Sequence, residues 1–279
     1  MKSARQLLHD AGLFAKKRFG QNFLVDMSVV QRIVDGSRVT CEDAVLEIGP
    51  GLGVMTRLLA SRVKTLYALD ADRDMIAELE ASELAQMPHV SILHGDALRY
   101  PFDAFPTPLH VVANLPYNIS SQVLIRFLEC QTQIASFTVM LQKEMADRLL
   151  APPGGKDYGP LAVYMALYCE MAPVIKRIGP KSFYPPPKID STVIRGVMRT
   201  NVTLPPFAFM SQLVRQGFSQ RRKTMNNALK GSPFVAEWQR GAAAIGVSPD
   251  VRAETITPQQ YAMLAEFYQR ELTLPSQLP

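Results

Sequence analysis

The chemistry that this sequence could perform centres on Asn114–Tyr117, which reads Asn-Leu-Pro-Tyr. The apolar residues 111–113 before it are typical of the end of a buried parallel strand. Pro116 ends that strand, because its ring fixes φ and it has no N–H to donate. An amide side chain, free carbonyls and an aromatic ring then remain at a strand's carboxyl end, where open α/β sheets bind ligands. The amide and carbonyls can accept hydrogen bonds from an amine, and the ring can stack on a flat base. Taken alone, the stretch is equally compatible with a turn that carries a tyrosine.

Three other predicted strand ends carry groups that suit a nucleoside. Glu47–Gly53 (Glu-Ile-Gly-Pro-Gly-Leu-Gly) follows a buried strand and opens a helix, and its glycines let the backbone approach a ligand closely. It is neither a dinucleotide fingerprint, which needs glycine at Val54, nor a P-loop. Asp70 ends the next strand, where a carboxylate can accept two ribose hydroxyls, and Asp96 ends the third, where it can accept an adenine amine. Each acid alone could be a helix cap, but three strand ends in register predict a nucleoside pocket.

The elements that must position these groups alternate between strand and helix. We expect strands at 44–48, 65–70, 90–94, 109–113 and 137–141, with helices near 28–38, 54–62, 74–84, 121–129 and 143–150. Such alternation predicts a parallel sheet with right-handed crossovers. Further along we expect a buried helix at 161–168 and strands at 174–178 and 192–197, then helices at 207–219, 222–229, 234–244 and 258–269. The chain thus reads as an α/β body followed by a small helical appendage.

The charge distribution indicates contact with a polyanion. Residues 1–40 carry seven Lys and Arg against three Asp and Glu, residues 41–200 fifteen against seventeen, and residues 201–279 eight against five. A nearly neutral body between basic ends suggests nucleic acid, although an ordinary soluble protein with a mild basic bias is the alternative. Lys16, Lys17 and Arg18 precede two phenylalanines, and Arg215–Lys230 holds five cations and no acid. Both stretches suit phosphate contacts.

Several classes of protein are disfavoured by what the sequence lacks. No run of eighteen apolar residues predicts a transmembrane helix, and the N-terminus has no apolar segment of a secretory signal. The three cysteines and four histidines are widely spaced, which suggests neither a disulfide set nor a metal site. We therefore expect a cytoplasmic protein with no membrane partner and no metal.

Five motifs together resemble the small-subunit (16S) ribosomal RNA adenine N6,N6-dimethyltransferases of the KsgA type. They are Gln21–Leu24, Asn114–Ser120, Leu141–Glu144, Phe183–Lys188 (Phe-Tyr-Pro-Pro-Pro-Lys) and Gln220–Thr224. Glu47–Gly53, Asp70 and Asp96 resemble the S-adenosylmethionine site of class I methyltransferases, and Asn114–Tyr117 resembles the motif of enzymes that methylate exocyclic amines. These matches extend over nearly the whole chain.

The resemblance implies a Rossmann-like class I methyltransferase fold, with a mostly parallel seven-stranded sheet and helices on both faces. It implies a catalytic domain over residues 1–200, including a basic arm and helix over 1–40, and a small all-helical RNA-binding domain over 206–279. The methyl donor S-adenosylmethionine would be held by Asn22, Leu24, Glu47, Gly49, Gly51, Asp70, Asp96, Ala97 and Asn114. Many relatives have Glu at the position of Asp70, and the shorter side chain should still reach the ribose.

The implied reaction is methylation of N6 on two adjacent adenosines in the loop of the 3′-terminal hairpin of 16S rRNA, within the immature 30S subunit. The enzyme is expected to act as a monomer. The implied catalytic residues are Asn114, Leu115, Pro116, Tyr117 and Phe183. Phe183 is preferred to Tyr184 as the second ring on the adenine, because the family places its aromatic there. The expected RNA contacts are Lys16, Lys17, Arg18, Arg221, Arg222 and Lys223.

Two alternatives stay open. Large-subunit rRNA adenine methyltransferases of the macrolide-resistance type share the fold and an Asn-x-Pro-Tyr motif, although Pro185–Ser191 and Arg221–Lys223 favour the small-subunit enzyme. The chain could also act mainly as an RNA-binding ribosome assembly factor with dispensable catalysis. A DNA adenine methyltransferase is disfavoured, because no separate target-recognition domain is evident.

Overall fold

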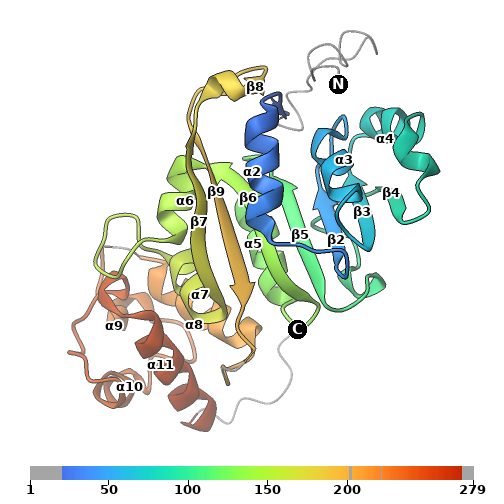
Figure 1. Ribbon diagram of the computed structural model, residues 1–279. Helices are drawn as coiled ribbons and strands as arrows, with labels where there is room; N and C mark the ends of the chain where they lie inside the picture. Colours follow the sequence, from blue (N-terminus) through green and yellow to red (C-terminus); the bar gives the residue numbers. More distant parts are fainter. Residues whose placement is uncertain (1–20, 201–202, 221, 272–279) are drawn as a thin grey trace. The chain divides into compact units, whose positions relative to one another are not determined.

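The computed structural model describes residues 21–200, 203–220 and 222–271 (Figure 1). The chain divides into two compact units, one formed by Met1–Ala146 with Met171–Met198 and the other by Asp147–Glu170 with Arg199–Pro279. In the part of the chain that the structure describes, no helix combines the length and apolar character needed to cross a membrane.

The first unit is built on a seven-stranded sheet with the order β4-β3-β2-β5-β6-β9-β7. Its strands are β2 (Ala44–Ile48), β3 (Thr65–Asp70), β4 (Val90–His94), β5 (Leu109–Asn114), β6 (Ile134–Gln142), β7 (Cys169–Ile178) and β9 (Ser191–Met198). Neighbours from β4 to β6 are parallel, and β9 is antiparallel to β6. The order reverses between β2 and β5, and such a switch point opens a crevice at the strands' carboxyl ends. The predicted mostly parallel sheet is confirmed.

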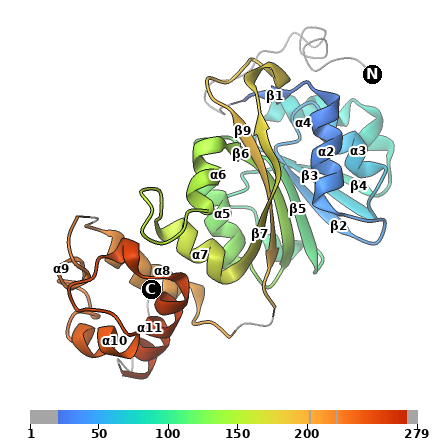
Figure 2. The ribbon, with the colours of Figure 1, turned by 60° about the vertical axis from the view of Figure 1, so that its left-hand side comes forward.

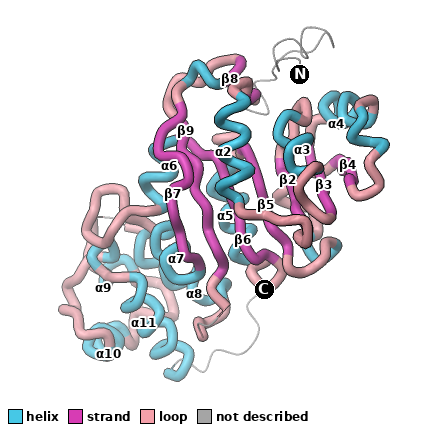
Figure 3. The backbone as a smooth tube through the Cα atoms, viewed as in Figure 1, coloured by secondary structure: helices cyan, strands magenta, loops and turns pink. Residues whose placement is uncertain are grey.

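Helices cover both faces of this sheet (Figures 2 and 3). The helices are α2 (Met27–Ser37), α3 (Val54–Ala60) and α4 (Arg73–Glu80) on one face, and α5 (Ser120–Glu129) on the other, with α6 (Lys143–Leu149) following β6. On the face of α5 the core is aromatic, with the rings of Phe127 and Phe137 5.4 Å apart.

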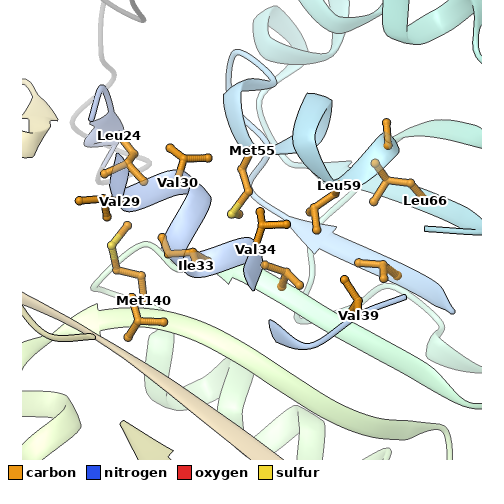
Figure 4. Close-up of a cluster of buried hydrophobic side chains, with 14 of the residues drawn as sticks. Leu24, Val29, Val30, Ile33, Val34, Val39, Met55, Leu59, Leu66 and Met140 are labelled. Carbon is orange, nitrogen blue, oxygen red and sulfur yellow. The ribbon is translucent and has the colours of Figure 1, made fainter. Parts of the chain in front are cut away.

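An apolar cluster fills the space between α2, α3 and the sheet (Figure 4). Val30, Ile33 and Val34 recur on one face of α2, the spacing that buries one side of a helix. They pack with Leu59 of α3 and Met140 of β6. Because four aliphatic side chains of α2 face this cluster, the cavity described below has a water-excluding side.

A short ribbon joins two segments that lie far apart in the sequence. β1 (Phe23–Leu24) is antiparallel to β8 (Phe183–Tyr184), with Phe23 opposite Tyr184 and Leu24 opposite Phe183. Ser182 strengthens the connection, because its carbonyl accepts the Val25 N–H at 2.8 Å and its hydroxyl donates to the Asp26 carboxylate at 3.1 Å. The loop between β7 and β9 is thereby tied to the start of α2.

The second unit is helical. Its helices are α7 (Pro160–Tyr168), α8 (Phe207–Phe218), α9 (Met225–Ala228), α10 (Trp238–Ala244) and α11 (Pro258–Glu271). The helix expected at 222–229 is confined to α9, because Thr224 has extended backbone and the helix begins after it. Residues 147–170, expected within a domain over 1–200, belong here. α7 is apolar on every side and is enclosed by α8 and α11, as such a helix requires.

Gly196 of β9 provides a test of the sheet packing. It lies opposite Phe137, and a Cβ at this position would lie 2.2 Å from Phe137 Cζ. Gly196→Ala should lower the free energy of unfolding by about 1–3 kcal/mol, because the ring must shift within a packed core. Denaturant unfolding measures this effect. Gly179→Ala is the matched control, since its new Cβ would meet open space at a φ of −76°. Equal stability of the two variants would contradict this packing.

Candidate active site

A cavity of about 300 Å³ opens at the carboxyl ends of the central strands in the first unit. It lies at the switch point between β2 and β5, the place that the strand order favours for a ligand. Five parts of the chain supply most of its lining, namely Gln21–Leu24, Glu47–Leu52, Leu69–Ala71, Gly95–Leu98 and Asn114–Ile119. The predicted strand-end groups therefore converge on one cavity.

The apolar side of the cavity is the end of the cluster in Figure 4. Leu24, Val30, Ile33 and Met55 belong to both. Because these side chains are packed among one another, this wall is already formed without a ligand. It offers a surface to apolar parts of a bound molecule and lowers the dielectric around the polar groups opposite.

The glycine loop lies against Phe23 and Asp70. Gly51 has a φ of +54°, a left-handed conformation that favours glycine, and a Cβ there would lie 3.0 Å from Phe23 Cε1. Its N–H donates to Asp70 Oδ2 at 3.2 Å. A side chain at Gly51 would therefore both strain the backbone and push Phe23 away from the cavity.

Asp70 is held in a fixed orientation at the end of β3. Its Oδ1 accepts the N–H of Asp72 at 2.9 Å, and its Oδ2 accepts that of Gly51. Burial raises the pKa of Asp70, and these two backbone donors oppose that rise. Asp72, itself buried, accepts the side-chain amide of Gln21 at 2.8 Å, which ties the covering segment to the same strand end. A carboxylate with both oxygens positioned in this way suits a pair of adjacent hydroxyls.

Glu47 is the most unusual group in the cavity. It lines the cavity from β2, is 0% exposed, and neither carboxylate oxygen has a hydrogen-bond partner among the described residues. Burial raises the pKa of Glu47 to about 8, and the nearby Asp70 charge adds to this rise. The Thr56 hydroxyl, although it makes no well-formed hydrogen bond to the carboxyl group, partly opposes it. A buried carboxyl group of this kind is neutral when alone and would be ionised by a cation bound beside it.

Asp96 and Ala97 follow β4 at the other end of the cavity. The Asp96 side chain is 48% exposed, and its Oδ1 accepts the N–H of Leu98 at 2.9 Å. Ala97 is buried. An oriented acceptor next to a small apolar residue suits an amino-bearing flat ring.

Asn114 and Tyr117 line the side of the cavity formed by the end of β5. Asn114 Nδ2 donates to the carbonyl of Asn22 at 3.1 Å. Because a carbonyl can only accept, this bond leaves the Asn114 side-chain oxygen free to accept from another donor. The Tyr117 hydroxyl is hydrogen-bonded to that of Ser191 at 2.9 Å, which anchors the ring. Leu115 is buried, and its N–H donates to Met140.

Some predicted residues lie away from the cavity lining. Phe183 is 4% exposed and belongs to the apolar cluster, whereas Tyr184 beside it is 38% exposed. Arg222 and Lys223 are exposed in the second unit. The other predicted RNA contacts, Lys16–Arg18 and Arg221, lie outside the described residues.

Among the residues that are described, no three His, Cys, Asp or Glu side chains are grouped to hold a metal ion.

Several contributors were not predicted from the sequence as members of the site. Gln21 and Phe23 line the cavity, and Asp72 and Ser191 hold Gln21 and Tyr117. Gln21 and Phe23 lie in the motif Gln21–Leu24, so their proximity to Asn22 and Leu24 was an available signal. Ser191 ends the motif stretch Pro185–Ser191, but no local pattern links it to Tyr117, or links Asp72 to Gln21, because these partners are distant in sequence.

Comparison with known proteins decides the family. The family model described as "Ribosomal RNA adenine dimethylase" matches residues 12–270. This chain belongs to that family. "Ribosomal RNA small subunit methyltransferase A" of Moorella thermoacetica is 38% identical over 277 residues, covering 94% of this chain and 96% of that protein. The protein of the same name from Neisseria gonorrhoeae is 38% identical over 255 residues, covering 91% and 96%.

Solved structures show the same fold. A dimethyladenosine transferase from Plasmodium falciparum has a TM-score of 0.76 at 24% identity, covering 89% of this chain and 98% of that one, and shows the fold. The 23S rRNA methyltransferase ErmE has a TM-score of 0.66 at 26% identity, covering 88% and 98%. The predicted methyltransferase fold and the predicted family of ribosomal RNA adenine dimethyltransferases are thus confirmed.

Glu47 predicts a specific pH dependence of stability. Its pKa is raised from 4.5 to about 8, so between these values the folded protein keeps a proton that the unfolded chain releases. Stability therefore falls as pH rises through this window. Glu47→Gln cannot ionise. Its free energy of unfolding relative to that of wild type should therefore increase by about 3 kcal/mol when the pH is raised from about 5 to about 7.5. Denaturant unfolding at both pH values measures the gain, with the exposed Glu80→Gln as control. Parallel pH curves for wild type and Glu47→Gln would refute it.

Proposed function

We propose that this enzyme transfers methyl groups from S-adenosylmethionine to N6 of two adjacent adenosines in the loop of the 3′-terminal hairpin of 16S rRNA. The substrate is the immature 30S subunit in the cytoplasm, and the enzyme acts as a monomer without a metal. The observation that carries the proposal is the orientation of Asn114, whose side-chain oxygen is left free at a cavity shared with Glu47 and Asp70.

The residues present fit the methyl donor. Asp70 would accept the ribose hydroxyls, and Asp96 with Ala97 would hold the adenine at the end of β4. Glu47 is a buried acid without a hydrogen-bond partner among the described residues, which suits a ligand that carries positive charge. The donor, when bound, supplies a methyl group on a cationic sulfur. Asn22, Leu24, Gly49 and Gly51 complete the lining around it.

Asn114 would activate the target by accepting a hydrogen bond from its N6 amine. That amine is a poor nucleophile, because its lone pair is delocalised into the adenine ring. A second acceptor is needed for its other hydrogen. The carbonyl of Pro116 already accepts the N–H of Ile119 at 3.2 Å, which favours the carbonyl of Leu115. Two acceptors placed in this way favour a pyramidal nitrogen with a localised lone pair. The gain comes from positioning and electrostatics, since an amide is no general base.

Tyr117 would stack on the target adenine, with its ring held by the bond to Ser191. Phe183 is proposed as the second ring, and its strand partner Leu24 lines the cavity. A base inside a helix cannot reach such a pocket, so the adenosine must be unpaired in a loop or flipped out. The N6 proton is lost to water after transfer, because the methylated ammonium is strongly acidic.

The basic residues outside the cavity would bind the rRNA backbone. Arg222 and Lys223 are exposed, and we assign them, with Arg221 and Lys16–Arg18, to phosphate contacts. A large-subunit rRNA methyltransferase is the second candidate, because the fold of the 23S rRNA methyltransferase ErmE is similar over most of both chains.

A labelling experiment separates these candidates. The protein is incubated with S-adenosylmethionine carrying a labelled methyl group and with immature small subunits, large-subunit rRNA or duplex DNA. We expect label in the small-subunit rRNA, recovered as N6,N6-dimethyladenosine. Label in the large-subunit rRNA alone would establish the second candidate, and label in DNA alone would refute both.

The role of Asn114 has its own test. Asn114→Ala should lower the rate of methyl transfer at least 100-fold, as expected when a preorganised acceptor is removed. RNA affinity, measured by fluorescence anisotropy, should stay within about twofold, because the phosphate contacts lie elsewhere. Gln122→Ala, exposed on α5, is the matched control. A transfer rate near wild type at saturating donor and RNA would show that amine activation depends on other groups.

A further inference from the structure

The loop between β7 and β9 carries a positive surface that the proposed mechanism does not use. This loop contains β8 and extends past the end of the sheet (Figures 1 and 2). From Lys176, near the end of β7, to Asp190, at the end of the loop, the sequence has four cations and a single acid. We call six exposed residues at the end of β7 and in this loop the hairpin surface; they are Lys176, Arg177, Lys181, Tyr184, Lys188 and Ile189.

Most of the charge on the hairpin surface is not neutralised. The one acid, Asp190, accepts Arg177 Nε at 2.7 Å. Lys176, Lys181 and Lys188 make no ion pair with any other residue that the structure describes. Three unpaired ammonium groups at the end of β7 and in the loop after it attract phosphates.

The hairpin surface also exposes apolar side chains. Tyr184 is 38% exposed and Ile189 40% exposed, although both are large and apolar enough to favour burial. Aromatic rings among unpaired cations are the combination by which proteins bind single-stranded nucleic acid, with bases on the rings and phosphates on the cations. A duplex would not use the ring, because its bases are already stacked.

The hairpin surface adjoins both sides of the catalytic cavity. Tyr184 is the strand partner of Phe23, which lines the cavity, and paired strands lie only about 5 Å apart. At the other end of the loop, Ser191 is hydrogen-bonded to Tyr117, the proposed platform for the target base. A strand that leaves this platform therefore passes beside the loop that carries the hairpin surface.

The loop is held in place before RNA binds. Ser182 is bonded to Asp26 and Val25, and the carbonyl of Asp190 accepts the N–H of Lys143 at 2.9 Å. Three consecutive prolines, 185–187, restrict its backbone further. A surface that is already ordered loses little entropy on binding.

We propose that the hairpin surface binds the unpaired RNA strand next to the target adenosine, with Lys181 and Lys188 on its phosphates and Tyr184 stacked on a flanking base. This rests on the proposed function in one respect, that the substrate is a loop of rRNA. The site is distinct from the phosphate contacts assigned to Lys16–Arg18 and Arg221–Lys223, and it acts on the nucleotides adjoining the reaction.

The phosphate contacts are tested by salt dependence. The probe is an RNA hairpin with two adjacent adenosines in its loop, and binding is measured by anisotropy over a range of salt concentrations. Lys181→Ala with Lys188→Ala should reduce the slope of log affinity against log salt by about 1.4, or about 0.7 for each lost phosphate contact. Lys64→Ala removes one exposed lysine just before β3. It is the control for the loss of a surface charge and should leave the slope unchanged. An unchanged slope in the double variant would overturn the phosphate contacts.

The stacking contact is tested by removing the ring and, separately, the base. Tyr184→Ala should weaken binding about fivefold or more with the salt slope unchanged, and Tyr184→Phe should restore it. Replacing the flanking nucleotide by an abasic one should weaken wild-type binding and remove the difference between wild type and Tyr184→Ala. Equal loss for the intact and abasic RNA would overturn the stacking contact. Binding of S-adenosylmethionine serves as the folding control, and Tyr184→Ala should bind it as wild type does. If Tyr184→Ala is misfolded, the proposal is tested with Tyr184→Phe, which keeps the ring and should bind the intact RNA as wild type does and the abasic RNA more weakly.

The two proposals fail in different ways. Absence of methyl transfer to small-subunit rRNA by the wild-type protein would refute the proposed function. Normal transfer by the wild type, together with unchanged affinity and salt slope in all hairpin variants, would refute the hairpin surface alone.

Discussion

One hydrogen bond, from the Asn114 amide to the carbonyl of Asn22, organises the site. It joins residues 92 positions apart and spans 3.1 Å. Because the amide nitrogen of Asn114 donates this bond, the amide oxygen remains available at the end of β5. The same bond also holds the covering segment, Gln21–Leu24, over the cavity. That segment has a second attachment through Gln21 to Asp72 and a third through the β1–β8 ribbon. The acceptor group and the cover of the cavity are therefore positioned together.

The cavity contains a carboxyl group, that of Glu47, whose burial destabilises the folded protein. Burying an acid without a hydrogen-bond partner is unfavourable, and Glu47 shows the consequence in the raised pKa of its carboxyl group. Hydrophobic residues surround it on β2, which would be a stable strand without it. A protein that retains such a residue loses stability at the site, and binding of a cationic ligand would offset that loss. The cost therefore marks the position at which positive charge is expected, as perturbed acids often do at functional sites.

Local patterns were enough to predict most of the first unit. Buried strands that end at a glycine, an acid or Asn-Leu-Pro predicted the positions of Gly49, Asp70, Asp96 and Asn114, and all four line one cavity. The four residues lie together because the carboxyl ends of parallel strands must meet at one edge of the sheet. The β1–β8 ribbon could not be predicted, because two-residue strands have no periodicity. The helix expected at 222–229 is shorter in the structure, because apolar spacing does not show where the backbone becomes extended, as it does at Thr224.

Residues 147–170 show a different limit. Their apolar pattern correctly predicted a buried helix, but burial alone does not say against which partner. α7 is apolar on all sides, so only the three-dimensional contacts with α8 and α11 assign it to the second unit.

The sequence also does not show against which partner the ring of Phe183 packs. The motif predicted a ring near the target base, and in the structure that ring is packed in the core while its neighbour Tyr184 is exposed. A strand places successive side chains on opposite faces, so this short segment directs Phe183 into the apolar cluster and leaves Tyr184 exposed.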